Sequence, residues 1–340
     1  MYKSSAVRAA ALALAVLLWP AAGWAKITLI VSSWVSPTHS ISKGMAKWCE
    51  EVTLETAGRV ACNILPKPVS APPATFDSVR DGLADVSFSV PGYTPGRFVL
   101  TQLTELPFAG ESAEVTSVAY QRIYEKHLAA VDEYTGVKVL AVFTHGPGGI
   151  YNNTRPVKSA ADLQGLKFRV GGGMVNEIGK ALGANVTVKP ATESYELLST
   201  GVMDGVFFPS ESIASFKLEK LLRYRTEFPG GLYNTSFAFV MNAGTWSQIP
   251  KADQDIISRL SGEHVARVFG RGWDEADAHG ESVMRAASVQ VLQADKAFVD
   301  EVRKLTAPLE QKWIAEAKAA GLADPAQVLK AFRAEVAKAK

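Results

Sequence analysis

Short apolar runs alternate with amphipathic segments along the chain and predict strands and helices in turn. The segments with the alternation and β-branched content of strands are 26–34, 59–65, 85–90 and 137–145. The intervening segments whose apolar residues recur at helical spacing are 40–52, 76–83 and 111–134. This alternation predicts parallel strands with helices on both faces of a sheet.

A second, similar series starts after the glycine-rich loop 145–165. Its predicted elements are strands 166–170, 185–190 and 205–210 and helices 174–183, 192–201 and 212–224. Two such series predict an α/β fold of two lobes with a cleft between them. In open α/β sheets, ligands bind beyond the carboxyl ends of the strands, so we expect the site in this cleft.

The chain from Pro250 onward is mostly helical. Segment 250–287 is too long for one ordinary helix of a lobe, so we expect a long element there that braces both lobes. The last two helical segments, 295–321 and 324–340, are amphipathic with outward charges, which is typical of helices that pack against a core.

The first 25 residues have the order of a secretory signal peptide. Lys3 and Arg8 precede the apolar run AAALALAVLLW, and the small-residue segment AAGWA precedes Lys26. The apolar run is too short to span a bilayer, so we expect a cleaved signal and an exported protein. The alternative is an uncleaved membrane anchor.

The charge balance excludes some classes of partner. Without Lys3 and Arg8 the 36 basic residues become 34, equal to the 34 acidic ones, and no block of Lys or Arg stands out. A neutral chain of this kind argues against nucleic acid or an anionic membrane surface as the main partner. The roughly 315 remaining residues exceed what one hydrophobic core usually serves, which again favours two lobes.

Cys49 and Cys62 are the only cysteines. Export makes a disulfide between them chemically feasible, and closing so short a loop would contribute about 3 kcal/mol. Two separately buried thiols are the alternative. The chain has no CxxC motif and no Cys/His cluster, so neither redox catalysis nor a zinc site is supported.

The sequence offers little for an enzyme. After strand 166–170, Gly171 and Gly173 begin a dinucleotide fingerprint, but Asn176 stands where its third glycine is needed for close packing of helix and strand. There is no Walker motif, no G-x-S-x-G elbow and no HExxH pattern. We therefore expect no cofactor, no metal and no catalytic residues.

Arg169 is the first candidate for a binding residue. It lies near the carboxyl end of a short apolar strand, and its guanidinium fork matches a carboxylate in a two-pronged contact. The alternative is a structural ion pair with a buried Asp or Glu. The glycines that follow would make room for a ligand and lead into a helix whose N-terminus favours an anion.

The chain resembles the periplasmic solute-binding proteins of tripartite ATP-independent periplasmic (TRAP) transporters over nearly all of its predicted mature length. The resemblance rests on the order of VRDGLADVSFSVPGY, ELPF, SAADLQGLKFRV, KPATESYELLSTGVMDG and FVMNAGTW. It implies the two-lobe periplasmic binding protein fold, a location in the periplasm, and a receptor that delivers an organic acid to the membrane permease subunits. In this interpretation the protein is not an enzyme, and we expect it to be a monomer.

The resemblance also implies that Arg169 forms a salt bridge with the ligand carboxylate. Many members of the family carry a second arginine about seven residues before Pro156, where this chain has Gly149. We therefore predict a monocarboxylate. Backbone N–H groups around Gly148 and Gly149 and a ring N–H of His145 could replace the lost charge; the alternative is a glycine-rich hinge with His145 capping a strand end.

Further candidates lie after predicted strands, where they could face the cleft. Several are aromatic, which suits a carboxylate with an aromatic or bulky apolar body, although aromatic residues at strand ends are often only core residues. These candidates are Trp34, His39, Tyr93 and Phe98 in the first lobe and Phe208, Ser210, Glu211 and Asn234 in the second.

The predicted division assigns residues 1–25 to the signal peptide, 26–150 and 235–275 to lobe I, 151–234 and 276–325 to lobe II, and 326–340 to a C-terminal helix. Two alternatives to this function are a binding protein of another importer or sensor class and an exported hydrolase of small acids.

Overall fold

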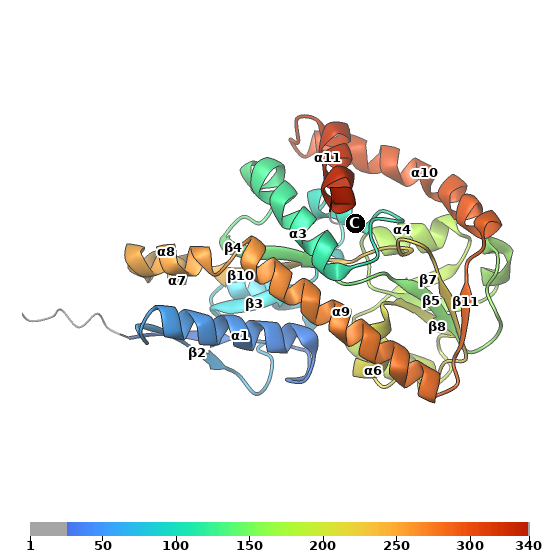
Figure 1. Cartoon of the computed structure of the whole chain (residues 1–340), viewed down its shortest axis with the longest axis horizontal. Coiled ribbons are helices and arrows are strands. Elements are labelled where there is room, and N and C mark those ends of the chain that lie inside the picture. The colour runs from blue at the N-terminus through green and yellow to red at the C-terminus, as the bar shows by residue number, and fades with distance from the viewer. Residues whose placement is uncertain (1–25, 339–340) are drawn as a thin grey trace, which may run out of the picture.

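The computed structural model describes residues 26–338 (Figure 1). The predicted signal peptide, residues 1–25, lies outside this range. Within the described part of the chain, no helix combines the length and apolar character that crossing a bilayer requires.

The first sheet has five strands in the order β2-β1-β3-β10-β4. These are β1 (Ile27–Val31), β2 (Val60–Ile64), β3 (Val86–Ser89), β4 (Val137–Thr144) and β10 (Ser236–Asn242). The helices connected with this sheet are α1 (Ser40–Glu55), α2 (Thr75–Arg80), α3 (Ala113–Ile123), α7 (Ala243–Gln248) and α8 (Lys251–Arg259). The predicted helix 111–134 is regular only as far as Ile123 and continues as a π-helical turn over Tyr124–Leu128.

The second sheet has six strands in the order β11-β9-β5-β8-β6-β7. These are β5 (Gly149–Asn152), β6 (Lys167–Val170), β7 (Asn185–Val188), β8 (Gly205–Phe208), β9 (Tyr224–Glu227) and β11 (Gln290–Gln293). The helices α4 (Met174–Ala181), α5 (Ser194–Ser199) and α6 (Ser210–Ser215) connect its strands. The two sheets with their helices form the α/β two-lobe fold predicted from the sequence, whereas the predicted lobe boundaries stay a prediction.

Two strands depart from the all-parallel prediction. β10 is antiparallel to β3 and β4, and β5 is antiparallel to β8 and β9. Each of these strands comes directly after a strand of the other sheet: β5 follows β4, and β10 follows β9. The chain leaves one sheet at the carboxyl ends of its parallel strands and enters the next sheet at the facing edge, so the entering strand runs the opposite way.

A long helix, α9 (Glu263–Ala286), packs against α1 and α3 beside the first sheet and against α6 beside the second (Figure 1). Two glycines permit these close contacts. A Cβ at Gly270 would lie 2.5 Å from Cα of Glu114, and one at Gly280 would lie 2.1 Å from the carbonyl oxygen of Ser210. The predicted bracing element is therefore α9, and it is separated from α8 by a turn at Gly262, whose φ is 60°.

The chain ends in α10 (Lys296–Ala319) and α11 (Pro325–Lys338). The indole N–H of Trp313 in α10 donates to the carbonyl oxygen of Val99 at 3.0 Å, and Phe332 in α11 is buried in the same core. Cys49 of α1 and Cys62 of β2 form a disulfide with their Cα atoms 5.7 Å apart. The structure thus joins the two cysteines instead of burying two separate thiols.

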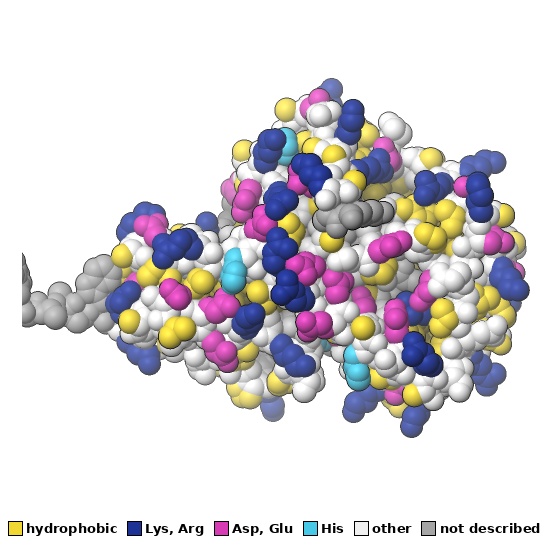
Figure 2. All heavy atoms as spheres, viewed as in Figure 1, with side chains coloured by type: hydrophobic (Ala, Val, Ile, Leu, Met, Phe, Trp, Pro, Cys, Tyr) yellow, Lys and Arg dark blue, Asp and Glu magenta, His cyan; other side chains and the backbone are white. Residues whose placement is uncertain are grey.

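Acidic and basic side chains are mixed over the face that carries α9 (Figure 2). Arg267 and Arg271 of this helix both pair with Glu114 of α3, at 2.9 and 3.1 Å. Such pairing leaves no large field of one sign on this face.

Candidate ligand-binding site

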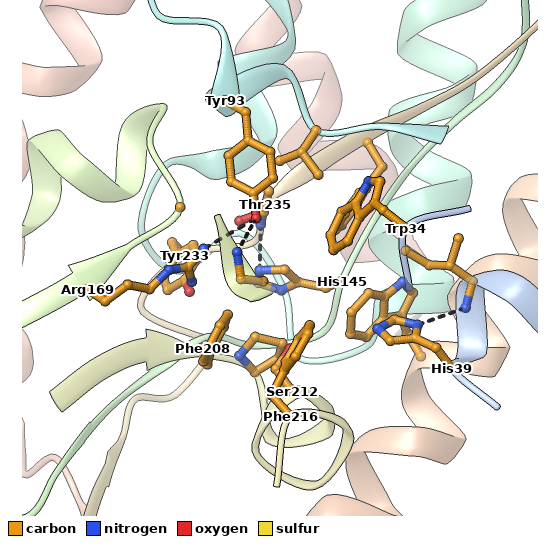
Figure 3. Close-up of a pocket in the computed structure, with 17 residues that line it drawn as sticks. Trp34, His39, Tyr93, His145, Arg169, Phe208, Ser212, Phe216, Tyr233 and Thr235 are labelled. Atoms are coloured by element: carbon orange, nitrogen blue, oxygen red, sulfur yellow. Dashed lines mark hydrogen bonds between the residues drawn. The ribbon is translucent and has the colours of Figure 1, made fainter. Parts of the chain in front are cut away.

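A cavity of about 50 Å³ lies between the two sheets. Its walls come from both halves of the molecule and are mostly aromatic, and Figure 3 shows their arrangement. The residues that line it include Trp34, His39, Tyr93, His145, Arg169, Phe208, Ser212, Phe216, Tyr233, Thr235, Phe237 and Trp273.

Arg169 reaches this cavity from β6 and is only 1% exposed. Its Nε–H donates to the carbonyl oxygen of Lys189 at 2.8 Å, and Nη2 donates to the Tyr93 hydroxyl oxygen at 3.3 Å. Among residues 26–338, no Asp or Glu forms a salt bridge with it. The alternative of a structural ion pair therefore does not describe this arginine, and a buried cation without a counter-charge is suited to an anion in the cavity.

Two aromatic residues hold the guanidinium in place. The Phe208 ring lies below it, with a distance of 4.4 Å from the ring centre to the guanidinium carbon. The Tyr93 hydroxyl oxygen also accepts the backbone N–H of Ala191 at 2.9 Å. Since both bonds use the lone pairs of this oxygen, the hydroxyl proton of Tyr93 remains able to donate to a ligand oxygen.

The glycines after Arg169 lead into α4, as predicted, and they also have a second role. Gly172 has φ of 78°, and a Cβ there would lie 2.2 Å from the carbonyl oxygen of Gly92, so the two backbones pass each other closely. Of the three glycines, only Gly171 lines the cavity. Their main role is therefore to let the two halves of the molecule meet beside the cavity.

The anion at the N-terminus of α4 is a side chain of this chain, not a ligand. The buried carboxylate of Glu105 accepts the backbone N–H of Met174 at 2.9 Å and both the N–H and the hydroxyl of Ser236, at 3.1 and 2.6 Å. Burial raises the pKa of Glu105, and these three hydrogen bonds oppose that rise. The prediction of a ligand anion at this helix end was therefore wrong.

His145 lines the cavity, but both of its ring nitrogens are engaged by the backbone. Nδ1–H donates to the carbonyl oxygen of Gly146 at 2.5 Å, and Nε2 accepts the N–H of Thr235 at 3.1 Å. Burial lowers the pKa of His145 to about 4, which fits a neutral ring. No ring N–H is left for a ligand, so the strand-capping alternative describes this histidine better.

Gly148 and Gly149 lie away from the cavity, on a separate hollow. The N–H of Gly148 donates to the carbonyl oxygen of Tyr233 at 2.8 Å, so it is not available to a ligand. A Cβ at Gly148 would lie 2.3 Å from the Tyr233 ring, and one at Gly149 would lie 2.8 Å from the carbonyl oxygen of Thr226. These glycines make room for an aromatic wall and a tight strand pair, which corrects the prediction that they contact the ligand.

His39, before the first turn of α1, lines the cavity and contacts Glu211 of α6. Its Nδ1 accepts the N–H of Ile41 at 3.2 Å, which places the proton on Nε2, 3.1 Å from Oε1 of Glu211. Burial lowers the pKa of His39 to about 3 and raises that of Glu211 to about 7. The contact is therefore a hydrogen bond from a neutral imidazole and not an ion pair.

Besides Gly148 and Gly149, four further predicted candidates do not line the cavity. Phe98 is buried in the core, where its ring stacks on Tyr134 at 5.1 Å, and Nδ2 of Asn234 donates to the carbonyl oxygen of His145 at 3.0 Å. Ser210 and Glu211 lie behind the wall at the start of α6, where the N–H of Glu211 donates to Asp277 at 2.7 Å.

Several aromatic residues of the wall were missed by sequence reasoning. Phe216, Tyr233, Phe237 and Trp273 all line the cavity. Trp273 lies in α9 at a helical spacing from Phe269, a pattern that indicates a core position, and Tyr233 follows two glycines in a loop. Their convergence on one point depends on tertiary contacts that one sequence does not reveal.

Within the described residues 26–338, no group of three or more His, Cys, Asp and Glu side chains is arranged to hold a metal ion. The site offers one buried cation, a hydroxyl donor and a flat apolar enclosure. Two α/β lobes with such a site between them define a solute-binding protein.

The comparison with known families agrees with this class. Residues 31–317 match the model of the bacterial extracellular solute-binding protein family 7, and the chain belongs to this family. The similar solved structures are TRAP periplasmic solute-binding proteins.

Three solved structures illustrate the similarity. A TRAP solute-binding protein from Bordetella bronchiseptica with bound (R)- and (S)-mandelate is 46% identical, with a TM-score of 0.90 over 92% of this chain and 100% of that one. One from a marine metagenome, specific for aromatic acid ligands and crystallised with 3-hydroxybenzoate, is 33% identical, with a TM-score of 0.86 over 92% and 99%. One from Rhodoferax ferrireducens with copurified benzoate is 31% identical, with a TM-score of 0.85 over 92% and 98%.

Proposed function

We propose that this protein is a periplasmic receptor that binds an aromatic monocarboxylate through a salt bridge to Arg169 and delivers it to the permease of a TRAP transporter. The observation that carries the proposal is the buried guanidinium of Arg169, which faces an aromatic cavity and has no acidic partner among residues 26–338.

The chemistry of the cavity supports a single carboxylate. Among residues 26–338, Arg169 is the only Lys or Arg that lines the cavity, and His145 and His39 are neutral because burial lowers their pKa values. A second carboxylate would lie against apolar rings without a cation, which is unfavourable. The flat rings of Trp34, Phe208 and Phe216 suit an aromatic body.

The similar proteins support the same class of ligand. Those described above contain mandelate, 3-hydroxybenzoate and benzoate, and each of these is an aromatic acid with one carboxylate. The family supports delivery to a TRAP permease and a periplasmic location.

The proposal is tested by thermal unfolding of the purified protein with a panel of acids. The panel contains benzoate, mandelate, hexanoate and succinate. We expect the aromatic monocarboxylates to raise the unfolding temperature most, because a ligand stabilises the state that binds it, and we expect succinate to have no effect. A shift with succinate alone would contradict the proposal. Mass spectrometry of any acid that copurifies would identify the natural ligand.

A further inference from the structure

The cavity has a second polar region away from Arg169. Figure 3 shows Arg169 and His39 at opposite ends of the cavity, with Ser212 on the wall between them. Ser212 lies in α6 and is only 4% exposed. Most other side chains around the middle of the cavity are aromatic or aliphatic, so a polar oxygen there is an exception that a ligand can use.

The hydrogen bonds around Glu211 determine what Ser212 can do. The Glu211 carboxylate accepts Nε2–H of His39, the hydroxyl of Ser212 at 3.0 Å and the hydroxyl of Ser215 at 2.5 Å. An ionised carboxylate has no proton to give, so Ser212 must donate its own. The oxygen of Ser212 is then left with lone pairs only, and it can accept a hydrogen bond but not donate one into the cavity.

We propose that Ser212 Oγ accepts a hydrogen bond from a ring hydroxyl of the ligand, so that the preferred ligands are aromatic monocarboxylates with a hydroxyl remote from the carboxylate. This inference rests on the proposed function and names a subclass of its ligands. A second carboxylate is disfavoured at this place because Glu211 lies directly behind Ser212.

A donor on the same cavity makes a hydroxyl more suitable than a group that only donates. The indole N–H of Trp273 is buried and has no hydrogen-bond partner among residues 26–338, and Trp273 lines the same cavity beside His39, with their ring centres 5.4 Å apart. A hydroxyl both donates and accepts. A hydroxyl therefore matches both kinds of group on this cavity, the accepting oxygen of Ser212 and the donating indole N–H of Trp273.

The test compares dissociation constants of four acids, measured by calorimetry at pH 8 with the mature protein. At this pH Glu211 is mostly ionised, since burial raises its pKa only to about 7. The acids are benzoate, 3-hydroxybenzoate, 4-hydroxybenzoate and isophthalate. We expect at least one hydroxybenzoate to bind about three- to tenfold more tightly than benzoate, the gain typical of one hydrogen bond, and isophthalate to bind more weakly than benzoate.

Two serine variants provide the matched control. Ser212 and Ser215 both donate to Glu211, but only Ser212 lines the cavity. Ser212→Ala lacks the oxygen that would accept the ligand hydroxyl. It should therefore reduce the preference for the hydroxybenzoate over benzoate to less than about twofold. Ser215→Ala should retain the preference, because it disturbs Glu211 without removing the acceptor.

Three results would overturn the inference. The first is equal affinity of the wild-type protein for benzoate and both hydroxybenzoates, which would leave the proposed function intact. The second is an equal loss of preference in Ser212→Ala and Ser215→Ala, which would assign the effect to the packing around Glu211. The third is a failure of all four acids to bind, which would contradict the proposed function as well.

Discussion

The hydroxyl oxygen of Tyr93 accepts a hydrogen bond from Nη2 of Arg169 at 3.3 Å, across the boundary between the two halves of the molecule. Tyr93 follows β3 of the first sheet, and Arg169 lies in β6 of the second. The same oxygen accepts the N–H of Ala191, also from the second half. One hydroxyl thus connects the buried cation to the opposite wall of the cavity, and it does so only when the two halves are together.

Replacing Tyr93 by phenylalanine removes this connection and keeps the ring. We predict that Tyr93→Phe weakens binding of benzoate about tenfold, because Arg169 loses an orienting partner and the closed arrangement loses two hydrogen bonds. Calorimetry measures the change. Tyr195→Phe is the control, since Tyr195 is 51% exposed and does not line the cavity. Equal affinities of Tyr93→Phe and the wild type would contradict this role.

Glu105 holds the start of α4 against the start of β10. We predict that Glu105→Gln lowers the free energy of unfolding by about 3 kcal/mol. One carboxylate oxygen becomes an NH₂ group, which cannot accept the hydrogen bonds that the backbone N–H or the serine hydroxyl donates to that oxygen. Urea denaturation measures the loss. Glu50→Gln, on the exposed face of α1, should change stability by less than about 0.5 kcal/mol. If both variants were equally stable, the hydrogen bonds of Glu105 would contribute nothing net.

The buried acids Asp277 and Glu211 predict a pH dependence of stability. Burial raises their pKa values from 3.8 and 4.5 to about 8 and about 7. The folded state therefore holds protons that the unfolded state has lost, and this stabilises it. The contribution to stability is complete below pH 3.8 and is lost as the pH rises through 7 and 8. His39 and His145, with lowered pKa values, act in the opposite direction only below pH 6.5.

We therefore predict that the unfolding temperature of the ligand-free protein falls between pH 6.5 and pH 8.5, a range fixed by these pKa values. Asp277→Asn should reduce the fall, because asparagine keeps the oxygen that accepts the N–H of Glu211 and has no proton to lose. Scanning calorimetry at several pH values measures both. An identical fall in wild type and variant would show that Asp277 does not titrate in this range.

The sequence alone was sufficient to predict the alternation of strands and helices, the bracing role of segment 250–287 and the family. These features depend on local periodicity and on ordered motifs. Arg169 could also be singled out, because an arginine in a short apolar strand is unusual. The antiparallel course of β5 and β10 could not be predicted, since it follows from where the chain crosses between the sheets.

The polar contacts of the site were harder to predict because they join residues far apart in the chain. A helix N-terminus after Gly173 favours an anion, but only the fold shows that Glu105 supplies it. The sequence suggested that the backbone N–H of Gly148 is free for a ligand, but in the fold it donates to the carbonyl oxygen of Tyr233. The sequence also suggested a free ring N–H on His145, but Gly146 and Thr235 engage its two ring nitrogens.

The central claim is that Arg169 anchors the ligand carboxylate. The most direct measurement is the dissociation constant of the panel acid that binds the wild type most tightly, determined by calorimetry for wild type, Arg169→Ala and Arg169→Lys. We predict a loss of at least about a hundredfold in Arg169→Ala, the expected effect of losing two charge-assisted hydrogen bonds, and a smaller loss in Arg169→Lys, which keeps the charge without the fork. Binding by Arg169→Ala within about threefold of wild type, less than one such bond contributes, would contradict the claim.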